Sequence, residues 1–204
     1  MKKQQVVVIH GGGSFVSIPR GSLIQKLQEK KVDINHLRRK VDWKFNLTDE
    51  LGEMYDVLAP RMPNADQPLY KEWKAWFERI LPTLDSELIV IGHSLGGLFL
   101  LKYFSEETSD KKIKGLFSVA APYVSVSAPG EFEKTDFLLS ENLENLNNIP
   151  HMFFYHSTDD AIVSVADVHV YAEKIPHARV QTFTDRGHFI GDNLPEIVPD
   201  IKSI

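Results

Sequence analysis

Short apolar segments alternate with segments of helical periodicity along the whole chain. Runs rich in Val, Ile, Leu and Phe and bounded by turn residues are typical of buried strands, and they lie at residues 5–9, 56–60, 87–91, 113–120, 151–155 and 179–184. Apolar positions three or four residues apart indicate helices at residues 22–30, 69–81, 95–104, 140–147, 165–175 and 194–204. Strands that alternate with helices predict right-handed βαβ units. The expected fold is therefore α/β, with one domain over residues 1–204, a mostly parallel sheet of about six strands, and helices on both faces.

The composition limits the class of protein. The chain has 204 residues, 43% of them hydrophobic and 25% charged, which suits one globular domain. Its formal net charge of −5 argues against a nucleic-acid partner. The absence of cysteine excludes disulfides and thiolate metal sites, and it suits a reducing cytoplasm. The first apolar run stops at His10, which is too early for a signal peptide, and no run approaches the ~18 residues of a membrane span.

Ligands of parallel α/β sheets bind beyond the carboxyl ends of the strands. In this chain the loops at those ends lie at residues 10–15, 92–97, 121–124, 156–163 and 185–189. The polar segment 122–139 is the longest strand-to-helix connection after the sheet centre and is a candidate short lid. The basic run 30–43 is interpreted as a solvated helical surface.

The pentapeptide Gly-His-Ser-Leu-Gly at residues 92–96 follows the apolar strand 87–91 and opens a predicted helix. This pattern fits the nucleophile elbow, in which a serine lies on a strained strand-to-helix turn and glycines allow the close approach of strand and helix. Ser94 is therefore the candidate nucleophile. A serine hydroxyl needs a base to take its proton, and the base, usually a histidine, needs a carboxylate to orient it.

Candidates for both partners follow Ser94 in the order acid, then histidine. Asp159 and Asp160 come directly after the strand 151–155, and His188 follows the strand 179–184 through a glycine. This is the chain order of the α/β-hydrolase triad. We favour Asp160 as the acid and keep Asp159 as an alternative, because neighbouring side chains point in different directions. The aspartate that is not used is interpreted as a turn or capping residue.

An oxyanion hole needs two backbone donors. The amide of Leu95 is one, and the second is expected from the glycine-rich loop after the first strand, with Gly12 as first candidate and Gly13 as second. His10 is expected to stabilise this loop. A phosphate cradle is disfavoured, because Gly11-x-Gly13-x-x-Val16 lacks the third glycine of the dinucleotide fingerprint.

The remaining histidines suggest no metal site, because no pair shows the helical i, i+4 spacing with a supporting glutamate. His93 is expected to point away from the nucleophile. His156 stands at the end of a predicted strand near the site, where it is a candidate for lining the pocket. No cofactor and no metal are expected.

The sequence motifs at residues 10–13, 92–97, 157–163 and 185–189 together resemble the α/β-hydrolase family over nearly the whole chain. The segments 59–63, 158–160 and 187–189 resemble one branch in particular, the small serine hydrolases related to retinoblastoma-binding protein 9. The resemblance implies a minimal sheet without the N-terminal antiparallel hairpin, and it favours Asp160 as the triad acid. Two features depart from that branch. Relatives often have glycine at the position of His156, and the first loop is closer to esterases with HGGG-type loops.

The leading hypothesis is a serine hydrolase that cleaves small carboxylic esters through an acyl-enzyme. Thioesters and amides remain open as substrates, because a triad sets acyl transfer and not the leaving group. The short candidate lid favours an open site for small or varied acyl groups. The alternative from another class is a hydrolase-like fold that serves as a binding module for a protein or a small molecule. No protein partner is indicated by the sequence itself.

Overall fold

The computed structural model describes residues 2–13, 24–25, 28–29, 34, 42–123 and 135–204. These residues contain a six-stranded sheet in the order β2-β1-β3-β4-β5-β6. All neighbouring strands in it are parallel. The strands are β1 (Gln4–Ile9), β2 (Tyr55–Leu58), β3 (Glu87–His93), β4 (Lys112–Val119), β5 (His151–Ser157) and β6 (Arg179–Phe183). The predicted α/β fold and its parallel sheet are confirmed.

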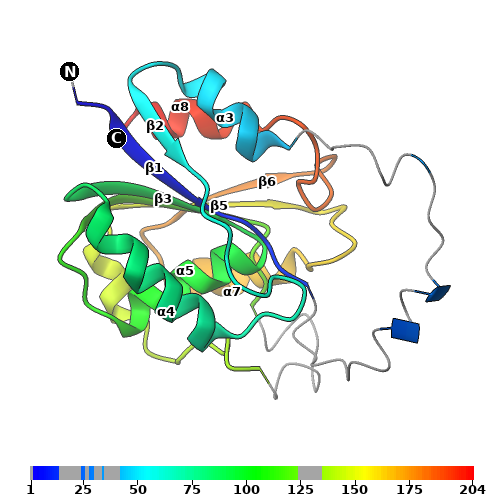
Figure 1. Ribbon diagram of the computed structural model, residues 1–204. Coiled ribbons are helices and arrows are strands. Elements are labelled where there is room, and N and C mark those ends of the chain that lie inside the picture. The colour runs from blue at the N-terminus through cyan, green and yellow to red at the C-terminus, as the bar shows by residue number, and fades with distance from the viewer. Residues whose placement is uncertain (1, 14–23, 26–27, 30–33, 35–41, 124–134) are drawn as a thin grey trace.

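Helices cover both faces of this sheet, as predicted. Figure 1 shows α3 (Trp43–Leu51) and α8 (Ile197–Lys202) on one face. On the other face lie α4 (Tyr70–Ile80), α5 (Leu95–Glu106) and α7 (Ala166–Lys174). Two 3₁₀ helices, η1 (Leu81–Thr83) and η3 (Glu144–Asn148), complete the described elements. No helix among these residues is long and apolar enough to cross a membrane.

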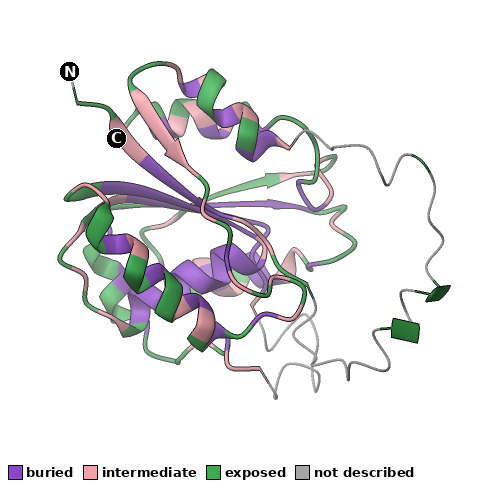
Figure 2. Ribbon diagram, viewed as in Figure 1, coloured by how far each residue is buried: buried purple, intermediate pink, exposed green. Residues whose placement is uncertain are grey.

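The core divides into two clusters, one on each face of the sheet, because successive strand side chains point to opposite faces. In β1, Val7 and Ile9 belong to the cluster under α4 and α5, whereas Val6 and Val8 belong to the cluster under α3 and α8. All four side chains are almost completely buried, and Figure 2 shows the central strands buried along most of their length. Burial on both faces explains why these strands have continuous apolar runs.

The structure differs from the sequence prediction at several helices. Helix α3 was not predicted. It begins at Trp43, with Asp42 as its N-cap, so the end of the basic segment 30–43 enters the core; most of that segment lies outside the described residues. The predicted helix 140–147 is instead the 3₁₀ helix η3. The last helix is shorter than 194–204, and its Pro199 falls in the first turn, where an amide has no intrahelical acceptor.

Two other predictions fall largely outside the described residues: the helix 22–30 and, within the candidate lid 122–139, residues 124–134. Both described ends of the candidate lid segment are attached to the body. The Tyr123 amide donates to the Asp167 carboxylate at 2.9 Å. Asp136 accepts the Tyr70 amide at 2.8 Å, at the start of α4.

Candidate active site

Ser94 lies on a strained turn between β3 and α5. Its backbone has φ 53° and ψ −122°, a conformation that non-glycine residues rarely adopt. Close packing requires glycine on both sides: a Cβ on Gly92 would lie 2.4 Å from the Gly96 carbonyl oxygen, and one on Gly96 would lie 2.3 Å from the Ile9 carbonyl oxygen. The Ser94 amide donates to the Val119 carbonyl of β4 at 2.7 Å. The predicted elbow is therefore present and fixed to the two central strands.

The structure brings His188 and Asp160 to Ser94. His188 Nε2 lies 2.9 Å from Ser94 Oγ, and His188 Nδ1 lies 2.8 Å from Asp160 Oδ2. The buried carboxylate only accepts hydrogen bonds when ionised, so Nδ1 carries the proton and Nε2 can accept one from the serine hydroxyl. The side chain of His188 is 8% exposed and that of Asp160 is fully buried.

Asp160 is held in its ionised form. Burial by itself would raise the pKa of this carboxyl, but hydrogen bonds from His188 and from the amides of Val163 and Ile162 outweigh burial and lower the pKa. The two amides donate to Oδ1, at 2.8 Å from Ile162 and 3.0 Å from Val163. Oδ2 is thereby left to His188.

Asp159, the alternative acid, does not contact the imidazole. Its Oδ1 accepts the Ser157 hydroxyl and the Gly187 amide, the latter at 2.9 Å, and these bonds lower the pKa of Asp159. The Ser157 hydroxyl oxygen in turn accepts the Arg186 amide at 3.1 Å. Asp159 thus holds the loop that precedes His188, while Asp160 holds the imidazole itself.

His93 contacts the histidine loop, and its ring centroid lies 5.2 Å from that of His188. Its Nε2 donates to the main-chain carbonyl of His188 at 2.8 Å. Burial, and secondarily the positive charge of Lys44, lowers the pKa of His93 to about 3, so the ring is neutral at ordinary pH. The next carbonyl, that of Phe189, accepts the indole N–H of Trp43 at 3.0 Å. Helix α3, which was not predicted, therefore supports the same loop.

The glycine-rich loop passes over the nucleophile. A Cβ on Gly11 would lie 3.2 Å from the Ser94 Cβ, and one on Gly12 would lie 2.4 Å from the Leu95 side chain. Among the described residues, the amides of Gly12 and Leu95 have no hydrogen-bond acceptor. The Gly13 amide donates to the Ala65 carbonyl at 2.6 Å. Gly13 was the second candidate for the oxyanion hole, but this bond already occupies its amide.

His10 stabilises the loop, as expected, and its ring nitrogens are both used. Nδ1 donates to the Gly11 carbonyl at 2.6 Å, and Nε2 accepts the Met62 amide at 2.8 Å. The imidazole also packs edge-on against Trp73, with ring centroids 5.7 Å apart. The first loop is thereby attached to the segment between β2 and α4.

His156 is not among the residues that line the pockets in the described part of the chain. Strand β5 continues to Ser157, two residues beyond its predicted end, so His156 remains inside the sheet and is 1% exposed. Its Nε2 donates to the Val163 carbonyl at 3.0 Å and lies 3.8 Å from Asp160 Oδ2. The signal for this placement was the aromatic run before His156, which continues the strand.

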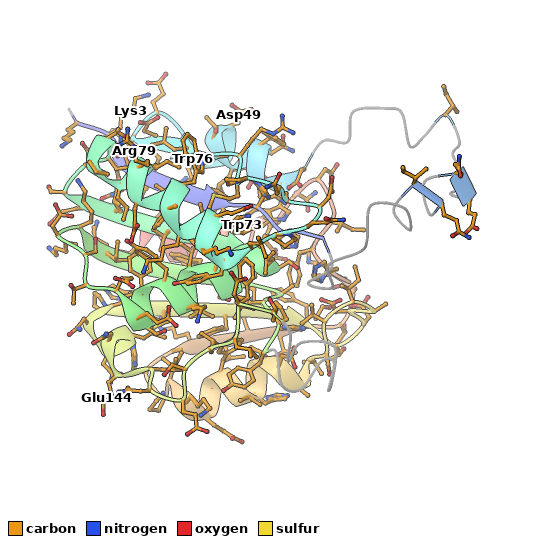
Figure 3. All side chains as sticks on the ribbon, turned by 60° about the horizontal axis from the view of Figure 1, so that its bottom comes forward. Lys3, Asp49, Trp73, Trp76, Arg79 and Glu144 are labelled. Carbon is orange, nitrogen blue, oxygen red and sulfur yellow. The ribbon has the colours of Figure 1, made fainter. Side chains whose placement is uncertain are left out.

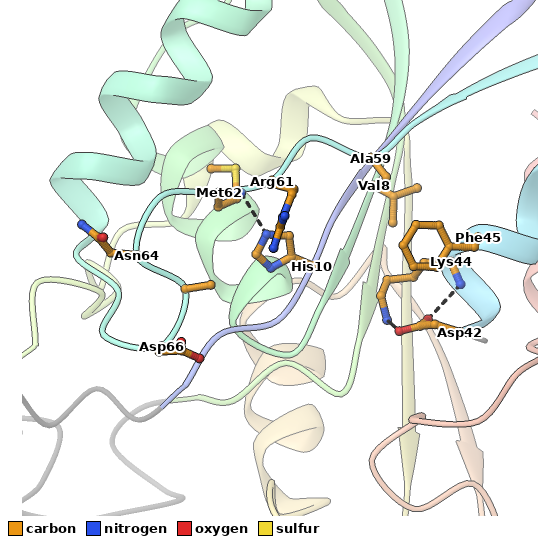
Figure 4. Close-up of a pocket in the computed structure, with 11 residues that line it drawn as sticks. Val8, His10, Asp42, Lys44, Phe45, Ala59, Arg61, Met62, Asn64 and Asp66 are labelled. Carbon is orange, nitrogen blue, oxygen red and sulfur yellow. Dashed lines mark hydrogen bonds and ion pairs between the residues drawn. The ribbon is translucent and has the colours of Figure 1, made fainter. Parts of the chain in front are cut away.

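A pocket of about 830 Å³ borders the first loop at the carboxyl ends of β1 and β2 (Figure 4). His10 lies on its wall, beside apolar side chains such as Phe45, Ala59 and Met62. Its cations are Arg61 and Lys44, and Lys44 forms an ion pair with Asp42 at 2.6 Å. This pocket could not be predicted from the sequence, because part of its wall is formed by α3.

The sheet order and the serine elbow between a central strand and its helix define the class of α/β hydrolases. The chain belongs to the serine hydrolase family, and the model of that family matches residues 37–194. A curated relative, "Serine hydrolase RBBP9" of Rattus norvegicus, is 26% identical over 151 residues, which cover 74% of this chain and 78% of that protein.

Solved structures share the fold at low identity. The ydeN gene product of B. subtilis superposes with a TM-score of 0.69 and 19% identity, covering 98% of each chain. Est1E of Butyrivibrio proteoclasticus gives a TM-score of 0.59 and 14% identity, covering 98% of this chain and 85% of that one. Figure 3 shows the side chains of the described residues on this fold.

Proposed function

We propose that this serine hydrolase cleaves carboxylic esters through an acyl-enzyme, with Ser94 as nucleophile, His188 as base and Asp160 as the acid that orients His188. The carrying observation is the continuous hydrogen-bonded line from Ser94 Oγ through the His188 ring to Asp160, with distances of 2.9 and 2.8 Å. Such a line is the arrangement that converts a weakly nucleophilic hydroxyl into a reactive one.

In the first step Ser94 Oγ attacks the ester carbonyl carbon while His188 Nε2 takes the hydroxyl proton. The carbonyl oxygen becomes an oxyanion, which the amides of Leu95 and Gly12 bind. The tetrahedral intermediate then collapses: the bond to the alcohol oxygen breaks, His188 gives its proton to the leaving alcohol, and the acyl group stays on Ser94.

In the second step water attacks the acyl-enzyme carbonyl while His188 Nε2 takes a water proton. Collapse of this intermediate breaks the bond to Ser94 Oγ, which regains a proton from His188, and the carboxylic acid leaves. The ionised Asp160 stabilises the imidazolium that forms in both steps. Each oxyanion donor typically contributes about 10²- to 10³-fold to the rate.

The pocket beside His10 supports a small-molecule substrate. Its volume of about 830 Å³ is within the range of ligand sites. The pocket borders the loop that passes over Ser94. We therefore assign to it the binding of either the acyl or the alcohol part of the ester. Among the fold relatives, one is described as the esterase domain of a Rhodothermus marinus protein and another as Est1E with ferulic acid bound, which makes esters the first substrates to test.

The test compares wild type with Ser94→Ala. We expect wild type to react with a fluorophosphonate probe and to hydrolyse nitrophenyl esters, and the variant to do neither. A folded wild-type protein that takes no label would overturn the proposal. Parallel thioester and amide substrates distinguish the leaving group. Binding of a ligand that is unaffected by Ser94→Ala, without any turnover, would favour the binding module instead.

A further inference from the structure

A second buried histidine lies directly behind the proposed triad acid. His156 and Asp160 have side chains that are 1% and 0% exposed, and His156 Nε2 lies 3.8 Å from Asp160 Oδ2. The mechanism above gives His156 no role. A buried imidazole beside a buried carboxylate is destabilising unless its polar atoms are paired, so the polar atoms of His156 are expected to have hydrogen-bond partners.

The hydrogen bond of His156 has a defined direction. Its partner is the main-chain carbonyl of Val163, 3.0 Å away, which can only accept. His156 Nε2 therefore carries a hydrogen. The amide of the same residue, Val163, donates to Asp160 Oδ1 at 3.0 Å. The main chain of Val163 is thus held by His156 on one side and holds Asp160 on the other.

Packing does little to fix the rest of this turn. Ile162, whose amide also donates to Asp160 Oδ1, has a side chain that is 68% exposed. The side chain of Val163, at 4% exposed, is buried in the body. Because the position of the two amides sets the rotation of the Asp160 carboxylate, the bond from His156 to Val163 fixes the direction in which Oδ2 faces His188.

We propose that His156 is a positioning residue for the hydrolytic reaction, acting through Val163 and Asp160 on the His188 imidazole. This inference rests on the proposed function of that triad. The bonds form one continuous line from His156 through Val163, Asp160 and His188 to Ser94. A displacement of about 1 Å within such a line can cost about 10²-fold in rate.

A role in filling the core would require only the shape of the ring, whereas positioning requires its N–H donor. Two variants separate these roles. His156→Leu keeps an apolar side chain of moderate size and removes the donor, while His156→Gln keeps an N–H group at a similar reach. His177 offers a matched control, because its Nε2 donates to the Ile149 carbonyl at 3.2 Å, in a loop that no proposed catalytic residue occupies.

The measurements are kcat and KM for a nitrophenyl ester and the midpoint of thermal unfolding. We expect His156→Leu to lower kcat about 10- to 100-fold with KM changed less than about threefold. His156→Gln should restore most of kcat, and His177→Leu should leave kcat unchanged. Equal kcat in wild type and folded His156→Leu would overturn the proposal, and so would Gln and Leu variants that are equally impaired.

A second readout does not depend on turnover. The proton on His188 Nδ1, shared with Asp160, gives a low-field NMR resonance that reports the geometry of that bond. We expect this resonance in wild type, His156→Gln and His177→Leu, and we expect it to shift or broaden in His156→Leu. An unchanged resonance in His156→Leu contradicts the positioning role. If wild type neither turns over esters nor takes the fluorophosphonate label, the proposed function fails, and the resonance alone decides the role of His156.

Discussion

The imidazole of His93 donates a hydrogen bond to the main-chain carbonyl of His188 at 2.8 Å. His93 is the residue before Ser94, so this one bond joins the turn that carries the proposed nucleophile to the loop that carries the proposed base. The donor is buried, being 6% exposed, and its neutral ring keeps the N–H in place. The elbow therefore does more than expose a serine, because it also sets the position of the histidine loop.

Removing this donor should impair catalysis more than substrate binding. In His93→Phe the buried carbonyl of His188 loses its partner, which costs about 1–3 kcal/mol of folding stability. The loop is then free to shift, and we expect kcat to fall about tenfold or more with little change in KM. Steady-state kinetics and urea unfolding check both values. His93→Gln, which keeps a donor, is the control and should lose less kcat and less folding stability. Equal losses in the two variants would contradict this role of His93.

His93 should also make folding stability depend on pH. Burial lowers the folded-state pKa of His93 from its ordinary value of 6.5 to about 3, so the folded protein keeps the ring neutral while the unfolded chain binds a proton below about pH 6.5. This contribution to folding stability is therefore fully present above pH 6.5 and is lost progressively as the pH falls toward about 3. Its upper limit is about 5 kcal/mol, which corresponds to the difference between pKa values of 6.5 and about 3.

Urea unfolding of wild type and His93→Gln at pH 7, about 5 and about 4 measures this contribution. Carboxylates such as Asp160, whose pKa is lowered, also lose stabilisation in acid, so the difference between the two proteins is the relevant quantity. We expect a smaller loss of stability in His93→Gln over this range. Parallel stability curves would show that His93 is not the titrating group.

The two neighbouring aspartates should respond differently to substitution. Asp160→Asn keeps the shape but removes the carboxylate that fixes the His188 tautomer, and we expect kcat to fall about 10⁴-fold. Asp159→Ala removes the acceptor of the Gly187 amide and leaves the imidazole contact intact. We expect a loss of about tenfold. Initial rates with one ester measure both losses. A larger loss in Asp159→Ala than in Asp160→Asn would identify Asp159 as the triad acid.

The pocket beside His10 should limit the size of the acyl or alcohol group that the enzyme accepts in its substrate. Ala59 is exposed on its wall, so Ala59→Trp would narrow the pocket without a contact to Ser94. We expect KM to rise for long esters, with short esters and fluorophosphonate labelling unaffected. Thr108→Trp fills a separate pocket of about 270 Å³ and is the matched control. An unchanged preference for ester length would exclude this pocket from substrate binding.

The sequence predicted those features that depend on residues close to one another along the chain. The apolar runs identified the strands, and the glycines around Ser94 identified the elbow, because each pattern is local. Helix α3 was missed because its apolar positions are irregular: Trp43 and Leu47 are buried, whereas Phe45 between them is 60% exposed. Such an interrupted stripe is a weak helix signal, although the helix supports the histidine loop.

The parts of the site that could not be predicted depend on contacts distant in sequence. The sequence ranked Gly12 before Gly13 as the second oxyanion donor but gave no contact to decide between them. The Ala65 carbonyl, which occupies the Gly13 amide, distinguishes them. Asp159 and Asp160 were separated in the same way, by the Gly187 amide and the His188 ring. Local patterns predict which residues reach the sheet edge, but not which atoms pair there.

The glycines of the elbow provide a test of how tightly the strand and helix must pack. In Gly92→Ala the new Cβ would lie 2.4 Å from the Gly96 carbonyl oxygen, and backbone atoms cannot move aside as a flexible side chain can. We expect a loss of about 3 kcal/mol or more in unfolding free energy, or failure to fold.

Gly191→Ala is the matched control, because its Cβ would meet nothing within 4 Å and its φ is outside the left-handed region. That variant should be neutral or slightly more stable, since alanine restricts the unfolded chain. Thermal and urea unfolding of both variants decide, and a stable Gly92→Ala protein that still reacts with a fluorophosphonate would show that the elbow tolerates a wider turn.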